Sequence, residues 1–191
     1  MEERKNFTIF ISYSWANPKN DTWVYDLATR LTENGIEVKL DKWDLKPGQD
    51  KYSFMESMVK DPSIDKVLII CDKTYKEKAD NRSGGVGTET QIITPEVYNQ
   101  ANQEKFIPII IEKGVSLDSY IPTYLKSRIG IDMSSEEIFE KGYEQLIRLI
   151  VGKPLYRRPA KGELPSYLFE EEKFHSKTKN LVNQLRYALI T

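Results

Sequence analysis

The sequence contains very few of the side chains that form disulfides, zinc sites and histidine-assisted nucleophiles. Its 191 residues include one cysteine, Cys71, and one histidine, His175. An internal disulfide needs two cysteines, and a Cys/His zinc cluster needs more ligands than these. A catalytic Cys-His or Ser-His pair would have to use His175. These chemistries are nearly excluded, we expect no metal site, and we interpret Cys71 as a buried strand residue and His175 as a surface helix residue.

The sequence also lacks a charge excess and a long apolar run. Twenty-eight basic residues stand against 29 acidic ones, a formal net charge of −1, so nothing favours nucleic acid or anionic lipid as a partner. No segment approaches the roughly 18 apolar residues of a membrane span, and the charged start MEERKN lacks the apolar core of a signal peptide. With 39% hydrophobic residues, we expect a soluble cytoplasmic domain that binds a small molecule or a protein.

Short apolar runs alternate with helical patterns between positions 7 and 151. The runs FTIFIS, IEVKL, DKVLIIC, FIPIII and RIGIDM predict five strands, although Pro108 suits a strand start or edge better than a central position. The segments NDTWVYDLATRLTENG, KYSFMESMVK and SSEEIFEKGYEQLIRLIVG predict helices, the last with a capping box formed by Ser134 and Glu137. Such alternation with short connections predicts a parallel sheet with helices on both faces.

The composition changes after Gly152, and this change divides the chain into three parts. Residues 1–151 are predicted to form the α/β domain. Residues 152–169 contain KPLYRRPAKGELPSYL, whose three prolines and lack of periodicity indicate a linker. Residues 170–191 are predicted to form a C-terminal helix, which we expect to lead into or dock on a further domain or partner.

Three polar loops follow the first three predicted strands. They are SYSWANPKN, DKWDLKPGQD and DKTYKEKADNRSGGVGTE. In a parallel sheet these loops lie at the same edge, and ligands bind outside the carboxyl ends of the strands. We therefore expect the functional site at this edge.

The stretch DNRSGGVGTETQIIT, residues 80–94, places three glycines shortly before Glu89. It matches neither a P-loop nor a dinucleotide-binding turn, because it lacks the Lys-Ser/Thr pair and the glycine spacing. One interpretation is a flexible loop with Glu89 in the first helical turn, where a carboxylate is favoured by up to about 1 kcal/mol. The other is a chemical role, because a helix terminus near Thr88 would hold Glu89 ionised to stabilise a developing cation. The pattern alone leaves both open.

The turn at residues 41–50 offers a similar choice. Trp43 is surrounded there by three aspartates, Asp41, Asp44 and Asp50. A loop tryptophan either packs on its own domain or stacks on a planar ligand. Asp72, after the third strand, has the place of the phosphoryl-accepting aspartate of receiver domains. That interpretation fails, because the first strand ends in SYSW where a receiver needs acidic residues for magnesium.

Three segments together resemble the Toll/interleukin-1 receptor (TIR) domain superfamily, in its bacterial branch bordering on SEFIR domains. They are FTIFISYSW, GIEVKLDKWDLKPGQD and VLIICDKTYKEKADNRSGGVGTETQIIT. The resemblance covers about residues 7–151. It implies a flavodoxin-like fold, with a five-stranded parallel sheet and helices on both faces, followed here by a C-terminal helical extension.

The resemblance implies one of two functions. Many bacterial and plant TIR domains cleave the nicotinamide–ribose bond of NAD⁺, which yields nicotinamide and ADP-ribose or a cyclic isomer, whereas others only assemble with further TIR domains. NAD⁺ is then a substrate and no cofactor is needed. An essential glutamate begins the helix after the third strand in the enzymes, and Glu89 has that place here. A bacterial antiviral defence role, through abortive infection, is also implied. A nucleoside or nucleotide-sugar transferase is a third and weaker hypothesis.

The resemblance also implies which residues line the NAD⁺ site. The DKWDLKPGQD segment matches the family's BB loop, which covers the nucleotide and contacts neighbouring domains. Many enzymatic members carry a tryptophan four residues before the glutamate, where this sequence has Gly85; Trp15 and Trp43 are the candidates to replace it. Self-assembly through the 41–50 loop into a homo-oligomer is expected for activity. The candidate NAD⁺-binding residues are Ser12, Tyr13, Ser14, Trp15, Asp41, Trp43, Leu45, Lys46, Pro47, Gly48, Gly85 and Gly87.

Overall fold

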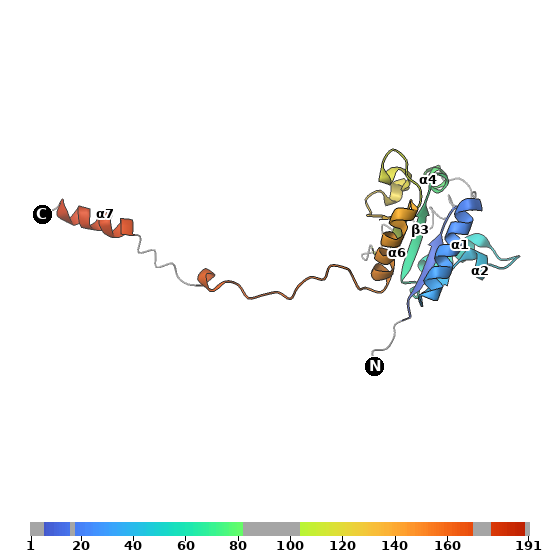
Figure 1. Cartoon of the computed structure of the whole chain (residues 1–191), viewed down its shortest axis with the longest axis horizontal. Coiled ribbons are helices and arrows are strands. Elements are labelled where there is room, and N and C mark those ends of the chain that lie inside the picture. Colours follow the sequence, from blue (N-terminus) through green and yellow to red (C-terminus); the bar gives the residue numbers. More distant parts are fainter. Residues whose placement is uncertain (1–5, 16–17, 82–103, 170–176, 190–191) are drawn as a thin grey trace. The chain divides into compact units, whose positions relative to one another are not determined.

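The computed structural model describes residues 6–15, 18–81, 104–169 and 177–189 (Figure 1). The chain divides into two units, Met1–Leu155 and Tyr156–Thr191. The sequence-based boundaries of domain, linker and terminal helix stay predictions.

The first unit is built on a five-stranded parallel sheet. Its strands are β1 (Thr8–Ser12), β2 (Glu37–Lys39), β3 (Lys66–Cys71), β4 (Phe106–Ile110) and β5 (Ile131–Asp132), in the spatial order β2-β1-β3-β4-β5. All four strand pairs are parallel. The predicted flavodoxin-like fold is therefore confirmed, because each apolar run became a strand of this sheet. The strands are slightly shorter than the runs that predicted them.

Pro108 lies in the middle of β4, which is an inner strand, and not at a start or edge as expected. Ile111 donates its N–H to Cys71 on β3, so the alternation of a strand points the position of Pro108 toward β5. The β4–β5 ladder begins only at Ile109. The missing N–H of proline therefore leaves no gap in the sheet's hydrogen bonds.

Two helices, α1 (Pro18–Glu33) and α6 (Glu136–Ile150), cover one face of the sheet. Alternate strand residues such as Ile9, Ile11, Leu68 and Ile70 pack into one cluster with the buried stripes of these helices. The helical contribution to this cluster is Val24, Leu27, Ala28, Leu31, Tyr143, Leu146 and Ile150. The capping box expected for α6 is not formed, because Ser135 is the N-cap and the Ser134 hydroxyl donates to Asp132 at 2.6 Å.

The opposite face is covered by α3 (Lys51–Lys60), α4 (Lys73–Asp80) and two 3₁₀ turns, η1 (Leu117–Tyr120) and η2 (Thr123–Leu125). The intervening strand residues, including Phe10, Val67 and Ile69, pack here. The sequence analysis treated residues 73–80 as loop, and this was wrong. Asp72 caps the first turn of α4 by accepting from the Tyr75 N–H, while Tyr75 and Ala79 supply the buried stripe.

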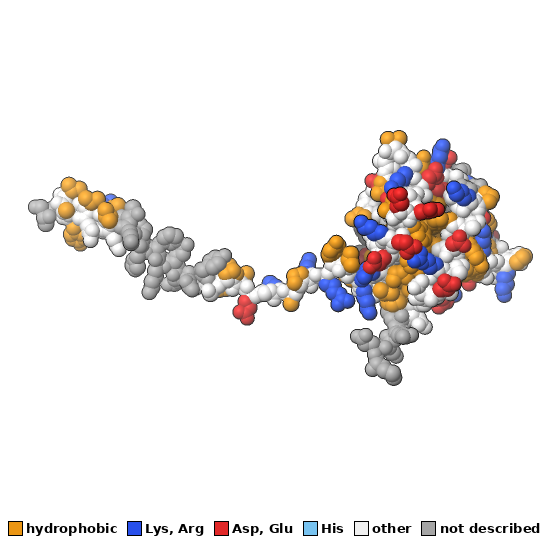
Figure 2. Space-filling view, in the orientation of Figure 1, with side chains coloured by type: hydrophobic (Ala, Val, Ile, Leu, Met, Phe, Trp, Pro, Cys, Tyr) orange, Lys and Arg blue, Asp and Glu red, His pale blue; other side chains and the backbone are white. Residues whose placement is uncertain are grey.

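The second unit contains a 3₁₀ turn, η3 (Ser166–Leu168), and the helix α7 (Lys177–Ala188). Exposed apolar side chains gather on α7 (Figure 2), among them Leu181, Val182 and Leu185. No helix in the described part of the chain is both long and apolar enough to cross a membrane.

Candidate functional site

Buried polar side chains mark one edge of the sheet. Within the described residues, the polar or charged side chains that are buried are Ser12, Ser14, Asp41 and Asp72. Each lies at or just beyond the carboxyl end of β1, β2 or β3. Parallel strands bring these ends together, and burying polar groups costs free energy unless they are hydrogen-bonded. Among the described residues, the edge therefore holds a group of buried polar side chains beside an otherwise hydrophobic core.

Tyr13 and Asp41 join the ends of β1 and β2. The Tyr13 hydroxyl donates a 3.0 Å hydrogen bond to Asp41 Oδ1, which also accepts from the Lys42 backbone N–H at 2.7 Å. Burial raises the pKa of Asp41 above its ordinary value, and these two hydrogen bonds act in the opposite direction. The carboxylate is thus held in place at the first residue of the 41–50 loop.

Ser12 belongs to a chain of hydroxyl groups. Its Oγ lies 3.1 Å from the Tyr75 hydroxyl, and that hydroxyl lies 3.4 Å from the hydroxyl of Tyr124. Tyr75 is fully buried in α4, and Tyr124 lies in η2. The chain links β1 to both elements and satisfies polar groups that would otherwise be costly to bury.

Asp72 connects β3 to α1 and α4. Its carboxylate accepts from the Tyr75 backbone N–H and from the side-chain amide of Asn20. The pKa of Asp72 is raised by burial above all, and the nearby Glu112 carboxylate raises it further, while the two hydrogen bonds oppose this. Asp72 is a structural cap of α4 at the edge of the site.

Two lysines approach the residues that follow β1. Lys78 of α4 donates to Ser14 Oγ at 3.3 Å. The ammonium group of Lys51, the first residue of α3, lies 3.3 Å from the ring centre of Trp15. Trp15 itself is 45% exposed. The segment Ser12–Trp15 thus places two buried hydroxyl groups, a partly exposed aromatic ring and two nearby cations at the sheet edge.

The 41–50 loop is more ordered than the predicted turn. A short helix, α2 (Asp41–Asp44), begins it. A turn follows in which Gln49 N–H donates to the Lys46 carbonyl at 3.1 Å and Gly48 has φ of +88°. Leu45 is half-buried, and Lys46, Pro47 and Gly48 are exposed. The loop therefore presents its Pro-Gly turn to the surroundings.

Trp43 packs against its own domain, which is the first of the two roles considered for a loop tryptophan. Its ring packs edge to face on Tyr25 of α1, with ring centres 5.9 Å apart. It remains 40% exposed. Trp15 and Trp43 were the candidates to replace the tryptophan that many enzymatic relatives carry where this chain has Gly85. Trp43 packs on the ring of Tyr25, whereas Trp15 contacts the ammonium group of Lys51.

The structure brings together Ser12, Tyr13, Ser14, Trp15 and Asp41 at one edge, with the rest of the 41–50 loop beside Asp41. Glu89, Gly85 and Gly87 lie outside the described residues, so their placement stays a prediction. The sequence analysis missed Lys51, Tyr75 and Lys78 as neighbours of the edge. Lys51 starts a predicted helix and Lys78 lies in a segment that was interpreted as loop, and only their helical placement brings them to Ser12–Trp15.

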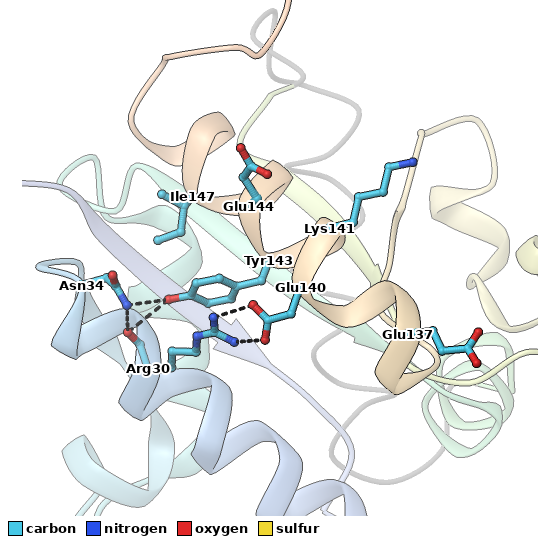
Figure 3. Close-up of a pocket in the computed structure, with 8 residues that line it drawn as sticks. All are labelled: Arg30, Asn34, Glu137, Glu140, Lys141, Tyr143, Glu144 and Ile147. Atoms are coloured by element: carbon cyan, nitrogen blue, oxygen red, sulfur yellow. Dashed lines mark hydrogen bonds and ion pairs between the residues drawn. The ribbon is translucent and has the colours of Figure 1, made fainter.

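Two surface hollows lie on the α1–α6 side and contain none of the predicted residues. One, of about 850 Å³, is lined by residues including Asn20, Trp23 and Phe139. The other, of about 620 Å³, lies over Arg30, Asn34 and Tyr143 (Figure 3). Arg30 forms two 2.7 Å hydrogen bonds with Glu140 and stacks 3.9 Å above the ring centre of Tyr143. These groups satisfy one another and fasten α1 to α6.

Within the described ranges no cluster of three or more His, Cys, Asp or Glu side chains is placed to hold a metal ion.

Comparison with known proteins shows similarity along most of the first unit. A family model described as TIR domain matches residues 9–147. The crystal structure of a prokaryotic SEFIR domain is 46% identical, over 82% of this chain and 100% of that one, with a TM-score of 0.66. No curated protein matches the chain.

Two more distant structures share the fold. The TIR domain of the Toll-related receptor TRR-2 from Hydra magnipapillata is 15% identical, over 75% of this chain and 97% of that one, with a TM-score of 0.55. The TIR domains of the activated Roq1 resistosome, which recognises the pathogen effector XopQ, are 16% identical, over 75% and 98% of the chains, with a TM-score of 0.52.

Proposed function

The chain belongs to the TIR domain family, and from this premise we propose that it is an NAD⁺ glycohydrolase that becomes active on self-assembly. Some TIR domains hydrolyse NAD⁺. The observation that carries the proposal is the gathering of the buried polar side chains at the carboxyl edge of the sheet. This is the edge at which open α/β sheets bind nucleotides.

The chemistry of the described edge suits a dinucleotide. Lys78 beside Ser14 provides positive charge for a pyrophosphate. Ser12 and Asp41 lie buried behind this edge, where their hydrogen bonds to Tyr75 and Tyr13 hold the loops that would surround a ribose. Trp15 is 45% exposed and contacts the Lys51 ammonium, so a planar ring can stack on it once that side chain moves.

In the proposed mechanism, Glu89 stabilises the positive charge that develops on the nicotinamide ribose. The C1′–N bond breaks and its electron pair leaves with the nicotinamide nitrogen, which becomes neutral. Water then adds its oxygen to C1′ and releases a proton, or an adenine nitrogen attacks instead and gives a cyclic product. A fixed carboxylate of this kind lowers the barrier by several kcal/mol.

The test is nicotinamide release from NAD⁺ by the purified chain over a range of protein concentrations. We expect release to rise steeply with concentration and to fall a hundredfold or more in Glu89→Gln, as expected for about 3 kcal/mol of transition-state stabilisation. Glu77→Gln is the matched control, because Glu77 is an exposed carboxylate on α4. Full turnover in Glu89→Gln would contradict the assigned role.

The biological setting proposed is bacterial antiviral defence. Assembly in response to infection would deplete cellular NAD⁺ or release a cyclic signal. In cells, expression of the wild-type chain under enforced oligomerisation should lower the NAD⁺ level, and expression of Glu89→Gln should not.

A non-enzymatic interaction module is the second candidate. The observation that favours it is the 46% identity with a prokaryotic SEFIR domain over that domain's full length, together with the exposed Pro47-Gly48 turn. This candidate predicts self-association without nicotinamide release, even when a fused oligomeriser drives assembly. Sedimentation and nicotinamide assays on the same samples separate the two functions.

A further inference from the structure

The three tryptophans of the chain have different partners. Trp23 packs edge to face on Phe139, with ring centres 5.9 Å apart, and Trp43 packs in the same way on Tyr25. Trp15 instead has the Lys51 ammonium over its ring, 3.3 Å from the centre. A cation in this position is attracted by the negative face of the indole. The face of Trp15 is therefore a binding site for a cation, and in this structure Lys51 occupies it.

We propose that the face of Trp15 is the platform for the nicotinamide ring of NAD⁺, and that Lys51 is an internal substitute which leaves when the substrate binds. This proposal rests on the proposed NAD⁺ site and names the residue that holds its reacting end. The nicotinamide of NAD⁺ is a planar pyridinium cation. It combines the flat shape that stacks on an indole with the positive charge that the indole face attracts.

The position of the pair in the fold supports this role. Trp15 follows Ser14, one of the buried polar residues of the edge, and keeps 45% of its surface exposed. Lys51 is the first residue of α3 and follows directly on the 41–50 loop. The Lys51 side chain can leave the ring of Trp15 by changing its rotamer, so the indole face can be uncovered without a change in the sheet or in α3.

The nicotinamide ring also loses its positive charge during the reaction, and this loss would favour release of the product. Breaking the C1′–N bond returns an electron pair to the nitrogen and leaves nicotinamide neutral. The neutral ring loses the cation–π attraction, whereas the Lys51 ammonium keeps its charge. Lys51 then regains the face of Trp15, which favours release of the product and resets the site.

The first experiment measures binding by calorimetry with carba-NAD⁺, a cleavage-resistant analogue that keeps the pyridinium, and with ADP-ribose, which has no nicotinamide. Trp15→Leu should weaken carba-NAD⁺ binding about tenfold and Trp15→Phe less, since phenylalanine keeps a smaller aromatic face. Lys51→Ala should strengthen carba-NAD⁺ binding severalfold. Binding of ADP-ribose should stay within about twofold in all three variants. Lys60→Ala, at the other end of α3, is the charge-matched control.

The second experiment examines the cation site without the dinucleotide. Quenching of tryptophan fluorescence by the N-methylnicotinamide cation should increase in Lys51→Ala. It should fall in Trp15→Phe to the level that the 40% exposed Trp43 gives, and neutral nicotinamide should quench less. If NAD⁺ is cleaved but Trp15→Leu leaves carba-NAD⁺ binding unchanged, the platform is wrong and the proposed function stands. If NAD⁺ is not cleaved but quenching follows this pattern, the cation site stands and the proposed function fails. Quenching that is independent of Trp15 and Lys51 overturns the inference.

Discussion

Tyr13 and Asp41 are joined by a 3.0 Å hydrogen bond although 28 residues separate them in the chain. Both side chains are buried. The bond connects the residue after β1 with the residue that starts the 41–50 loop. Two of the segments that make up the candidate site are thus fixed to one another by a phenol and a carboxylate.

Removing the Tyr13 hydroxyl should destabilise the fold. In Tyr13→Phe the buried Asp41 loses one donor, and a hydrogen bond to a charged group is worth about 1.5 to 3 kcal/mol. Because that bond lowers the pKa of Asp41 against the effect of burial, the variant should raise this pKa further. Urea unfolding at neutral pH measures the stability. Tyr25→Phe, which changes an exposed tyrosine, is the control, and equal urea midpoints for the two variants would contradict the assignment.

Asp72 should make the stability of the fold depend on pH in the direction opposite to that of most paired carboxylates. Its pKa in the folded state is raised, mainly by burial, above the value of about 3.9 expected in the unfolded chain. The folded state therefore binds the proton more tightly. This stabilising contribution is complete below about pH 4 and is lost as the pH rises through the folded-state pKa.

The Asp72→Asn variant isolates this effect, because asparagine is as good an N-cap as aspartate. Relative to the variant, the unfolding free energy of the wild type should decrease as the pH rises from about 4 and level off above the raised pKa. Urea unfolding of both proteins at several pH values measures the difference. A difference that increases with pH would refute the assigned direction.

Gly48 should be required for the form of the 41–50 loop. Its φ of +88° is unfavourable for residues with a Cβ, so Gly48→Ala should cost about 1 kcal/mol and distort the Pro-Gly turn. Gly48→Asn should cost less, since asparagine adopts this conformation more readily. Gly35→Ala changes a second glycine of positive φ outside the loop. We expect self-association, measured by sedimentation, to weaken in Gly48→Ala and to persist in Gly35→Ala.

Gly142 should be intolerant of even the smallest side chain. A Cβ at this position of α6 would clash with the Asp132 carbonyl oxygen and lie 2.8 Å from Met133 Cγ. Alanine favours a helix by about 1 kcal/mol over glycine, but the clash with backbone should exceed this gain, and we expect Gly142→Ala to lose about 1 to 3 kcal/mol. Chemical denaturation measures the loss. Its exposed neighbour supplies the control, Lys141→Ala, which should be nearly neutral; a stabilised Gly142→Ala would show that α6 can shift.

The sequence by itself determined the five strands and the class of fold. A strand that is buried on both faces of a sheet must be apolar along its length. Runs such as Phe7–Ser12 therefore predict strands from the sequence alone, without knowledge of the neighbouring strands. The Pro47-Gly48 turn could also be predicted from local sequence, because only certain residues adopt the backbone angles of such a turn. The segment resemblances then indicated the family, which the comparisons confirm.

Only the tertiary structure decided which distant residues meet. The helix α4 was hidden because its sequence, KTYKEKAD, is mostly polar and shows just two buried positions. The partners of Asp41, Trp15 and Ser14 lie on other elements, so no local pattern could reveal them. Periodicity reports how one segment is buried, whereas a contact between segments depends on strand order and helix packing. Glu89 lies outside the described residues, and its catalytic role stays a prediction that nicotinamide release will test.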